Sequence, residues 1–176
     1  SARDLSTHGD REFFRENNQE GIRLLSYSNE LIEILPKEGS EPLVTFSANQ
    51  SNSRKLGNTI VTIGNFSGLG NELIKIDSDG YSLLKDINNG SPSSFISDIA
   101  KINENLMIFT ATDNAIGNEL YATDGTISGT KLIKDLHPTE GSSIANMISF
   151  NGKAFFKGNN GVSVLPYVSD GTSEGT

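Results

Sequence analysis

A repeat of about 47 residues runs through this 176-residue chain and constrains its fold more than any other feature. The segment GNEL occurs at Gly70–Leu73 and again at Gly117–Leu120, 47 residues apart, and a short apolar run precedes each copy. The positions that mark this run in four successive units are Phe13, Val61, Ile108 and Phe155. Such regularity predicts a row of similar units, each of which contacts its neighbours.

Each unit is predicted to contain four short antiparallel strands. Its apolar runs are separated by Asn-Gly and Asp-Gly pairs, which favour tight turns. These pairs lie at residues 79–80, 89–90, 124–125, 151–152 and 170–171. Four strands in about 40–50 residues are typical of a β-propeller blade, whereas the coils of a stacked β-solenoid, the main alternative, have shorter periods. We therefore expect an all-β, β-propeller-like fold.

The repeat also predicts how the chain is divided. The units are expected at residues 9–56, 57–103, 104–150 and, as a partial unit, 151–176. Thr176 occupies the position of Thr130, in the middle of a unit. Because a closed propeller needs at least about four blades, we expect a single repeat domain with an incomplete array. It is expected to be a fragment of a longer protein, completed by the remaining blades of the same protein or by another chain.

Composition excludes several classes of function. The formal net charge is -8 and the Lys and Arg residues are scattered, so nucleic acid is not an expected partner. No apolar run approaches the roughly 18 residues that span a bilayer, which predicts no membrane insertion. The chain has no cysteine, which excludes disulfides and thiolate metal sites.

Residues 117–143, GNELYATDGTISGTKLIKDLHPTEGSS, resemble the bacterial repeat ELWxTDGTxxGTxLVKDIxPGxxSS, which is often described as hyalin-like. The matching positions are Glu119, Leu120, Asp124, Gly125, Thr126, Gly129, Thr130, Lys134, Asp135 and Pro138. The last unit keeps Asp170, Gly171, Thr172, Gly175 and Thr176. The resemblance implies a propeller-like scaffold in a large secreted or surface protein of bacteria. The expected location is therefore extracellular or at the cell surface.

Aspartates at the turns are the candidate metal ligands. Asp124 and Asp170 begin the two DGT loops, where an aspartate either accepts hydrogen bonds from the turn backbone or contributes oxygen to a calcium ion. Asp77 and Asp79 have the spacing that opens a calcium loop, although Asn88 stands where that loop would have a bidentate Glu. Calcium ion is thus the candidate cofactor, and turn formation is the alternative role of these four aspartates.

Two further recurrent features are predicted to be structural. Lys85–Asp86 and Lys134–Asp135 are adjacent on predicted strands, so the two side chains of a pair face opposite ways. Their recurrence indicates a role inside each blade, such as the aspartate capping a turn or the lysine pairing across blades. Glu72 and Glu119 are repeat-equivalent and would lie at equal depth in neighbouring blades, which makes them a poor acid–base pair for glycoside hydrolysis.

These observations predict a non-enzymatic scaffold module for adhesion or assembly. Two alternatives remain open. A glycan-binding, lectin-like propeller would use Tyr27, Tyr121 or Tyr167 between its blades, with a cell-surface glycan or protein as the partner. A secreted propeller hydrolase would have its active site mostly outside this chain.

Overall fold

The computed structural model describes residues 53–66, 68–77 and 80–176 with their side chains, and before residue 53 it describes the backbone of five strands. Every regular element in this described part is a β-strand, and every strand pair is antiparallel. The prediction of an all-β protein built from antiparallel strands is therefore confirmed.

The described strands form four sheets, each made of strands that are consecutive in the chain. The first sheet contains β1 (Leu5–His8), β2 (Arg11–Asn18), β3 (Gly21–Ser26) and β4 (Leu31–Ile34). The second contains β5 (Leu43–Phe46), β6 (Arg54–Leu56), β7 (Thr59–Phe66), β8 (Gly70–Asp77) and β9 (Gly80–Lys85). The third contains β10 (Ser97–Asn103), β11 (Leu106–Asp113), β12 (Gly117–Thr123) and β13 (Lys131–Lys134). The fourth contains β14 (Ala145–Phe150), β15 (Lys153–Asn159) and β16 (Val164–Ser169).

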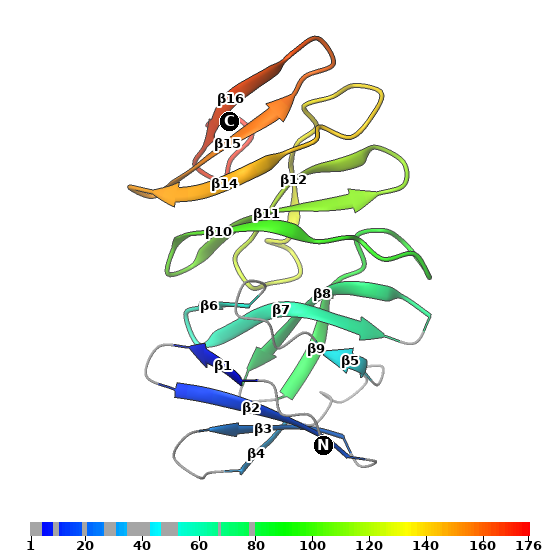
Figure 1. The fold of residues 1–176 in the computed structure, drawn as a ribbon, viewed down its shortest axis with the longest axis vertical. Helices are drawn as coiled ribbons and strands as arrows, with labels where there is room; N and C mark the ends of the chain where they lie inside the picture. Colours follow the sequence, from blue (N-terminus) through cyan, green and yellow to red (C-terminus); the bar gives the residue numbers. More distant parts are fainter. Residues whose placement is uncertain are drawn as a thin grey trace.

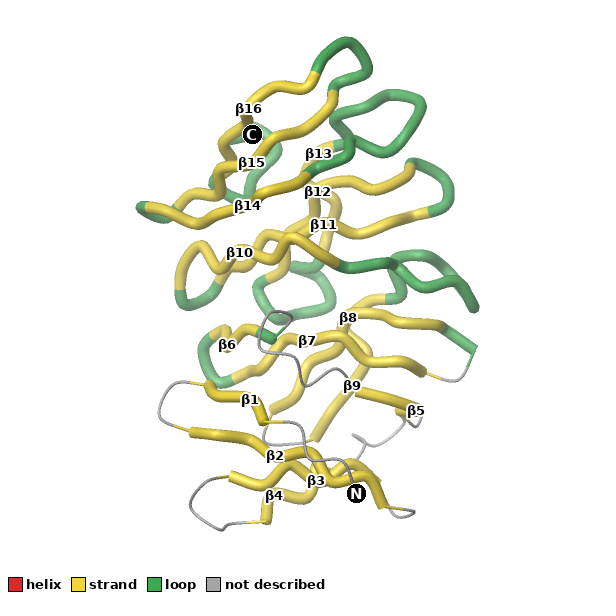
Figure 2. Tube along the Cα trace, in the orientation of Figure 1, coloured by secondary structure: helices red, strands yellow, loops and turns green. Residues whose placement is uncertain are grey.

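The four sheets lie one above another along the long axis of the molecule, in chain order (Figure 1). Strands fill each layer, while the loops gather at the edges of the layers (Figure 2). The first and fourth sheets lie at opposite ends, so the described sheets form an open stack and no closed ring. These sheets confirm one part of the fold prediction, namely an array of small antiparallel sheets.

The sheets are offset by one strand from the units expected in the sequence. The strand that closes an expected unit pairs instead with the first strand of the next unit, across a two-residue turn. In the fourth sheet this turn is Asn151–Gly152, with φ of 49° and 72°, which fits a tight hairpin. The turn between Asn103 and Leu106 joins β10 to β11 in the same way. Unit boundaries at residues 103 and 150 therefore fall beside or within hairpins, because a tight turn forces its flanking strands to pair.

Two apolar layers hold the last three sheets together. The first core layer, between the second and third sheets, consists of Leu56, Val61, Leu73, Leu84, Ile87, Ile96, Met107, Phe109, Ala111 and Tyr121. The second core layer, between the third and fourth sheets, consists of Ala100, Ile102, Ile108, Leu120, Ala122, Ile133, Leu136, Ile144, Ala154 and Phe156. Strand β11 contributes Phe109 to one layer and Ile108 to the other, because successive side chains face opposite ways. Its apolar run is continuous because both of its faces are covered.

We predict that Phe109→Ala lowers the free energy of unfolding by about 3–5 kcal/mol, because it leaves a cavity in the first core layer. The Phe109 side chain is fully buried and its ring stacks on Tyr121 with centroids 5.8 Å apart. Urea denaturation measures the loss. Phe95, which is 69% exposed, provides the matched control, and Phe95→Ala should change stability by less than about 0.5 kcal/mol. Equal losses in the two variants would contradict the assignment of Phe109 to the core.

Candidate functional site

The recurrent glutamate of the GNEL segment is buried in both described sheets that contain it. Glu119 on β12 has no exposed surface and accepts hydrogen bonds from the backbone N–H of Leu136 at 3.0 Å and of Ser142 at 2.9 Å. The Ser142 hydroxyl also donates to this carboxylate. Glu119 thus holds the chain that follows β13 against the third strand of its own sheet.

Glu72 on β8 bonds to the corresponding connection one unit earlier. It is also fully buried and accepts from the Ile87 backbone N–H at 2.9 Å and from the Ser94 hydroxyl at 2.5 Å. A buried carboxylate costs free energy unless its oxygens have hydrogen-bond partners. These donors come from the connection that leads into the next sheet, so the glutamate fixes the path between sheets.

The glycine that opens each GNEL segment allows this connection to pass close by. Gly117 has a φ of +88°, and a Cβ added there would lie 2.5 Å from the backbone nitrogen of Gly141. Gly70 has a φ of +72°, and its added Cβ would lie 2.8 Å from the backbone nitrogen of Ser93. Any side chain would collide with the backbone of the connection, and the left-handed conformation itself favours glycine.

Burial sets the protonation of these two glutamates. It raises the pKa of Glu72 from 4.5 to about 7, while the hydrogen bonds from Ser94 and Ile87 oppose the shift and nearby Asp86 adds to it. Burial likewise raises the pKa of Glu119, against the hydrogen bonds from Ser142 and Leu136. Desolvation is the largest of these influences, because burial disfavours the charged carboxylate.

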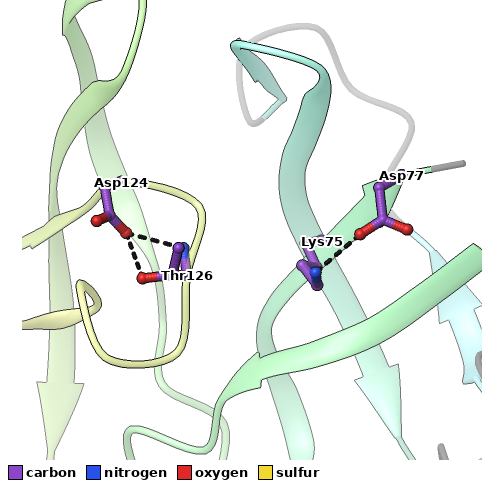
Figure 3. A network of polar contacts seen from close by, with 4 residues as sticks. All are labelled: Lys75, Asp77, Asp124 and Thr126. Atoms are coloured by element: carbon purple, nitrogen blue, oxygen red, sulfur yellow. Dashed lines mark hydrogen bonds and ion pairs between the residues drawn. The ribbon is translucent and has the colours of Figure 1, made fainter. Parts of the chain in front are cut away.

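The Asp-Gly loop between β12 and β13 is closed by its own side chains. Asp124 Oδ1 accepts from the Thr126 N–H at 2.9 Å and from the Thr126 hydroxyl at 2.6 Å (Figure 3). The Thr126 hydroxyl oxygen in turn accepts from the Gly129 N–H at 2.9 Å. The Thr130 hydroxyl donates to the Thr126 carbonyl at 2.7 Å and lies 2.7 Å from the Thr123 hydroxyl at the loop's other end.

The loop after β16 repeats these contacts. Asp170 Oδ1 accepts from the Thr172 N–H at 2.9 Å and the Thr172 hydroxyl at 2.7 Å, and Gly175 N–H donates to the same threonine at 3.0 Å. In both loops the threonine hydroxyl is the first cause of a lowered aspartate pKa. The turn-forming role expected as one alternative for Asp124 and Asp170 is therefore present in the structure.

The second glycine of each loop is required by the aspartate. A Cβ added to Gly129 would lie 2.0 Å from Asp124 Oδ1, and one added to Gly175 would lie 2.2 Å from Asp170 Oδ1. Neither glycine has a left-handed φ, so the reason for glycine here is space for the carboxylate and not backbone conformation.

Both recurrent lysines bond across sheets, and Asp86 caps a turn. Lys85 Nζ donates to the Thr130 carbonyl of the third sheet's loop at 3.0 Å, and Lys134 Nζ donates to the Thr176 carbonyl of the fourth sheet's loop at 3.1 Å. Both lysines thus bond across sheets. Asp86 Oδ2 accepts from the Gly90 N–H at 3.0 Å, which confirms turn capping in that unit.

Of the predicted metal ligands that the structure describes, Asp77 and Asp124 lie on different elements. Asp77 on β8 forms an ion pair with Lys75 at 2.8 Å, and Figure 3 shows this pair on a different element from the Asp124 loop. Asp79 lies outside the described residues. The residues that the structure describes contain no group of three or more histidine, aspartate or glutamate side chains that could hold a metal ion. Calcium binding stays a prediction, which thermal unfolding with calcium and with a chelator would test.

The candidate glycan-binding tyrosines have different surroundings. Tyr121 is 4% exposed and belongs to the first core layer, where burial raises its pKa to about 12. Tyr167 is partly buried and stacks on Phe156 with centroids 5.7 Å apart. Tyr27 lies outside the described residues. The ring of Tyr121 packs against protein, so it presents no face to a sugar.

No protein-family model matches the chain, and a search of curated proteins finds no match either. The hyalin-like resemblance therefore stays a prediction from the motif residues. Across the described residues, no helix has the length and hydropathy needed to cross a membrane.

The pairing of the recurrent glutamate with a serine was not among the features predicted from the sequence. Glu72 and Ser94 are 22 residues apart, and Glu119 and Ser142 are 23 apart. This nearly constant separation between the glutamate of the GNEL segment and the serine is visible in the sequence. It shows that the two segments belong to one unit, but burial of the carboxylate depends on how the connection folds over it.

We predict a strong coupling between Gly129 and Asp124. Gly129→Ala should destabilise the protein by about 1–3 kcal/mol, because its methyl group overlaps the Asp124 carboxylate. In the Asp124→Ala background the carboxylate is gone, so the same change should cost at least about 0.5 kcal/mol less. Urea denaturation of the four proteins measures the coupling. Gly175→Ala is the matched control, because its clash is with Asp170 and its cost should stay the same in the Asp124→Ala background.

We predict that the chain loses stability as the pH rises from 4.5 to about 7, the interval between the ordinary and the folded pKa of Glu72. The raised pKa means that the folded state binds this proton more tightly than the unfolded state. Its stabilising effect is therefore complete below pH 4.5 and is lost as pH approaches 7. One such group contributes a slope of at most about 1.4 kcal/mol per pH unit.

The variant Glu72→Gln has no titrating group at this position and should show a shallower slope in urea denaturation across that interval. The control is Glu104→Gln, because the Glu104 side chain is 81% exposed and its replacement should leave the slope unchanged. A Glu72→Gln slope equal to that of the unsubstituted protein would show that Glu72 does not control this pH dependence.

Proposed function

We propose that this chain is a non-enzymatic scaffold module of a larger bacterial surface or secreted protein, in which it serves adhesion or assembly. Its sheets act as blades of a β-propeller-like array, which the remaining blades of the same protein or of another chain complete. The partner that the array binds is a cell-surface glycan or protein.

One observation carries the proposal: the polar residues that recur from unit to unit bond to the protein's own chain. Glu119 binds the connection between sheets, Asp124 binds its own loop, and Lys134 bonds to the loop of the next sheet. A catalytic site needs polar groups directed at a substrate. Recurrent groups that make internal hydrogen bonds wherever the structure describes them instead support a structural purpose for the repeat.

The alternative functions have less support. Glu72 and Glu119 are fully buried and each accepts from its own serine, so this pair does not provide the carboxyl groups of a hydrolase. The lectin-like alternative uses a tyrosine between blades, but Tyr121 is in the core. The net charge of -8 argues against nucleic acid as a partner.

The location is tested by protease treatment of intact cells of the source organism. We predict that the protease degrades the protein on intact cells, or that the protein is found in the culture medium. A cytoplasmic protein followed in the same samples is the control and should stay intact until lysis. If this chain is also protected until lysis, the proposal of a surface or secreted scaffold is wrong.

A further inference from the structure

The outer face of the fourth sheet is apolar and uncovered. Ile148 on β14 and Phe150, two residues further along the strand, are each 62% exposed, while Phe155 on β15 and Val168 on β16 are each 39% exposed. The register places Ile148 opposite Phe155, and Phe155 opposite Val168. Directly opposed residues share a face of a sheet, so Ile148, Phe155 and Val168 form one row across three strands, and Phe150 lies beside this row on the same face.

Each of these positions has a counterpart one repeat earlier, and every counterpart is buried. The counterpart lies 46 to 48 residues before each exposed residue, on the equivalent strand of the third sheet. The pairs are Ala100 and Ile148, Ile102 and Phe150, Ile108 and Phe155, and Ala122 and Val168. All four counterparts belong to the second core layer, where the fourth sheet covers them with Ala154 and Phe156.

The burial patterns of the two central strands show the same difference. In β11, five consecutive residues from Met107 to Ala111 are buried, because sheets lie against both faces. In β15, buried and exposed residues alternate from Lys153 to Gly158, because only one face is covered. The exposed apolar residue in β15 is Phe155. Protein surfaces that bind no partner rarely expose rows of large apolar side chains.

The face also carries charge. Lys153 and Lys157 are exposed and lie two residues to either side of Phe155, and therefore on the same face of β15. The residue one repeat before Lys153 is Leu106. Leu106 lies close to the Asp-Gly loop of the next sheet, because a Cβ added to Gly171 would be 2.6 Å from Leu106 Cδ2. In a repeated arrangement, an Asp-Gly loop would approach Lys153, where its carboxylate and carbonyls would complement the ammonium group.

We infer that the outer face of β14–β16 is a stacking surface for one further unit of this repeat, placed as the fourth sheet is placed on the third. The covering sheet presents small and aromatic side chains like Ala154 and Phe156 to the apolar row, and an Asp-Gly loop to Lys153. This inference rests on the proposed scaffold function, but its test uses only purified protein, so the two can fail separately.

The test supplies such a unit from the protein's own sequence. Thr176 has the position of Thr130, so a second copy of residues 131–176 joined after Thr176 continues the repeat in register. Hydrogen exchange of the added residues is measured by mass spectrometry in the full chain extended in this way. We expect their strand amides to exchange at least about tenfold more slowly than unfolded chain, as those of a packed sheet do.

Phe155→Asp tests whether the added sheet uses the proposed face. In the extended chain it should remove most of that protection, whereas in the original chain it should change the melting temperature little, because Phe155 is partly exposed there. Val162→Asp is the matched control. Val162 is 90% exposed in the turn between β15 and β16, and its replacement should alter neither chain.

Two results would overturn the inference. One is an added unit that exchanges like unfolded chain, or whose protection is unaffected by Phe155→Asp. The other is a dimer of the original chain, seen by sedimentation and dissociated by Phe155→Asp, which would show that the face binds a second copy of the whole chain instead.

Discussion

The hydrogen bonds between a buried glutamate and a distant serine are the contacts on which the stacked arrangement depends. In each of the two sheets where it is described, the glutamate lies on the third strand in the order β5-β7-β8-β9 or β10-β11-β12-β13. The serine lies in the connection that leads to the next sheet. The connection therefore has one path across the sheet edge. Because that path sets where the next strand begins, a local polar contact determines how neighbouring sheets are placed. The glycine that opens the GNEL segment lets the connection pass close to the strand. The serine of that connection can then reach the glutamate, so the glycine and the serine act together.

The Asp-Gly loops contribute a second link between sheets, in the opposite direction along the chain. Each loop is made rigid by its own aspartate and threonines, and it then offers a backbone carbonyl to a lysine of the preceding sheet. Apolar contact between sheets is not directional, so it would allow many relative positions. The lysine bonds and the glutamate contacts select one position among them. Apolar side chains at alternate strand positions thus stabilise the stack by burial, and the recurrent polar residues determine how neighbouring sheets are positioned.

Several features of this structure can be predicted from local sequence. The period places Val61, Ile108 and Phe155 on equivalent strands, and the Asn151–Gly152 pair marks a hairpin because its backbone favours that turn. The cross-sheet bonds of Lys85 and Lys134 follow from recurrence, together with the alternation of side chains in a strand. Other features cannot be predicted in this way. The strand that ends an apparent unit pairs forward with the next sheet, and Tyr121 lies in the core although its position in the repeat is also consistent with a binding surface.

The sequence by itself determined that this protein is a repeat of short antiparallel strands, because period, turn residues and strand alternation are properties of neighbouring residues. It also determined which residues recur. Only the tertiary structure decided which groups these residues bind and how deeply they are buried. Burial of Glu72 and Glu119, the space that Gly129 leaves for Asp124, and the exposed row on the fourth sheet all depend on segments that are distant in the chain. Pairing between such segments is set by packing of whole sheets, which no local pattern specifies.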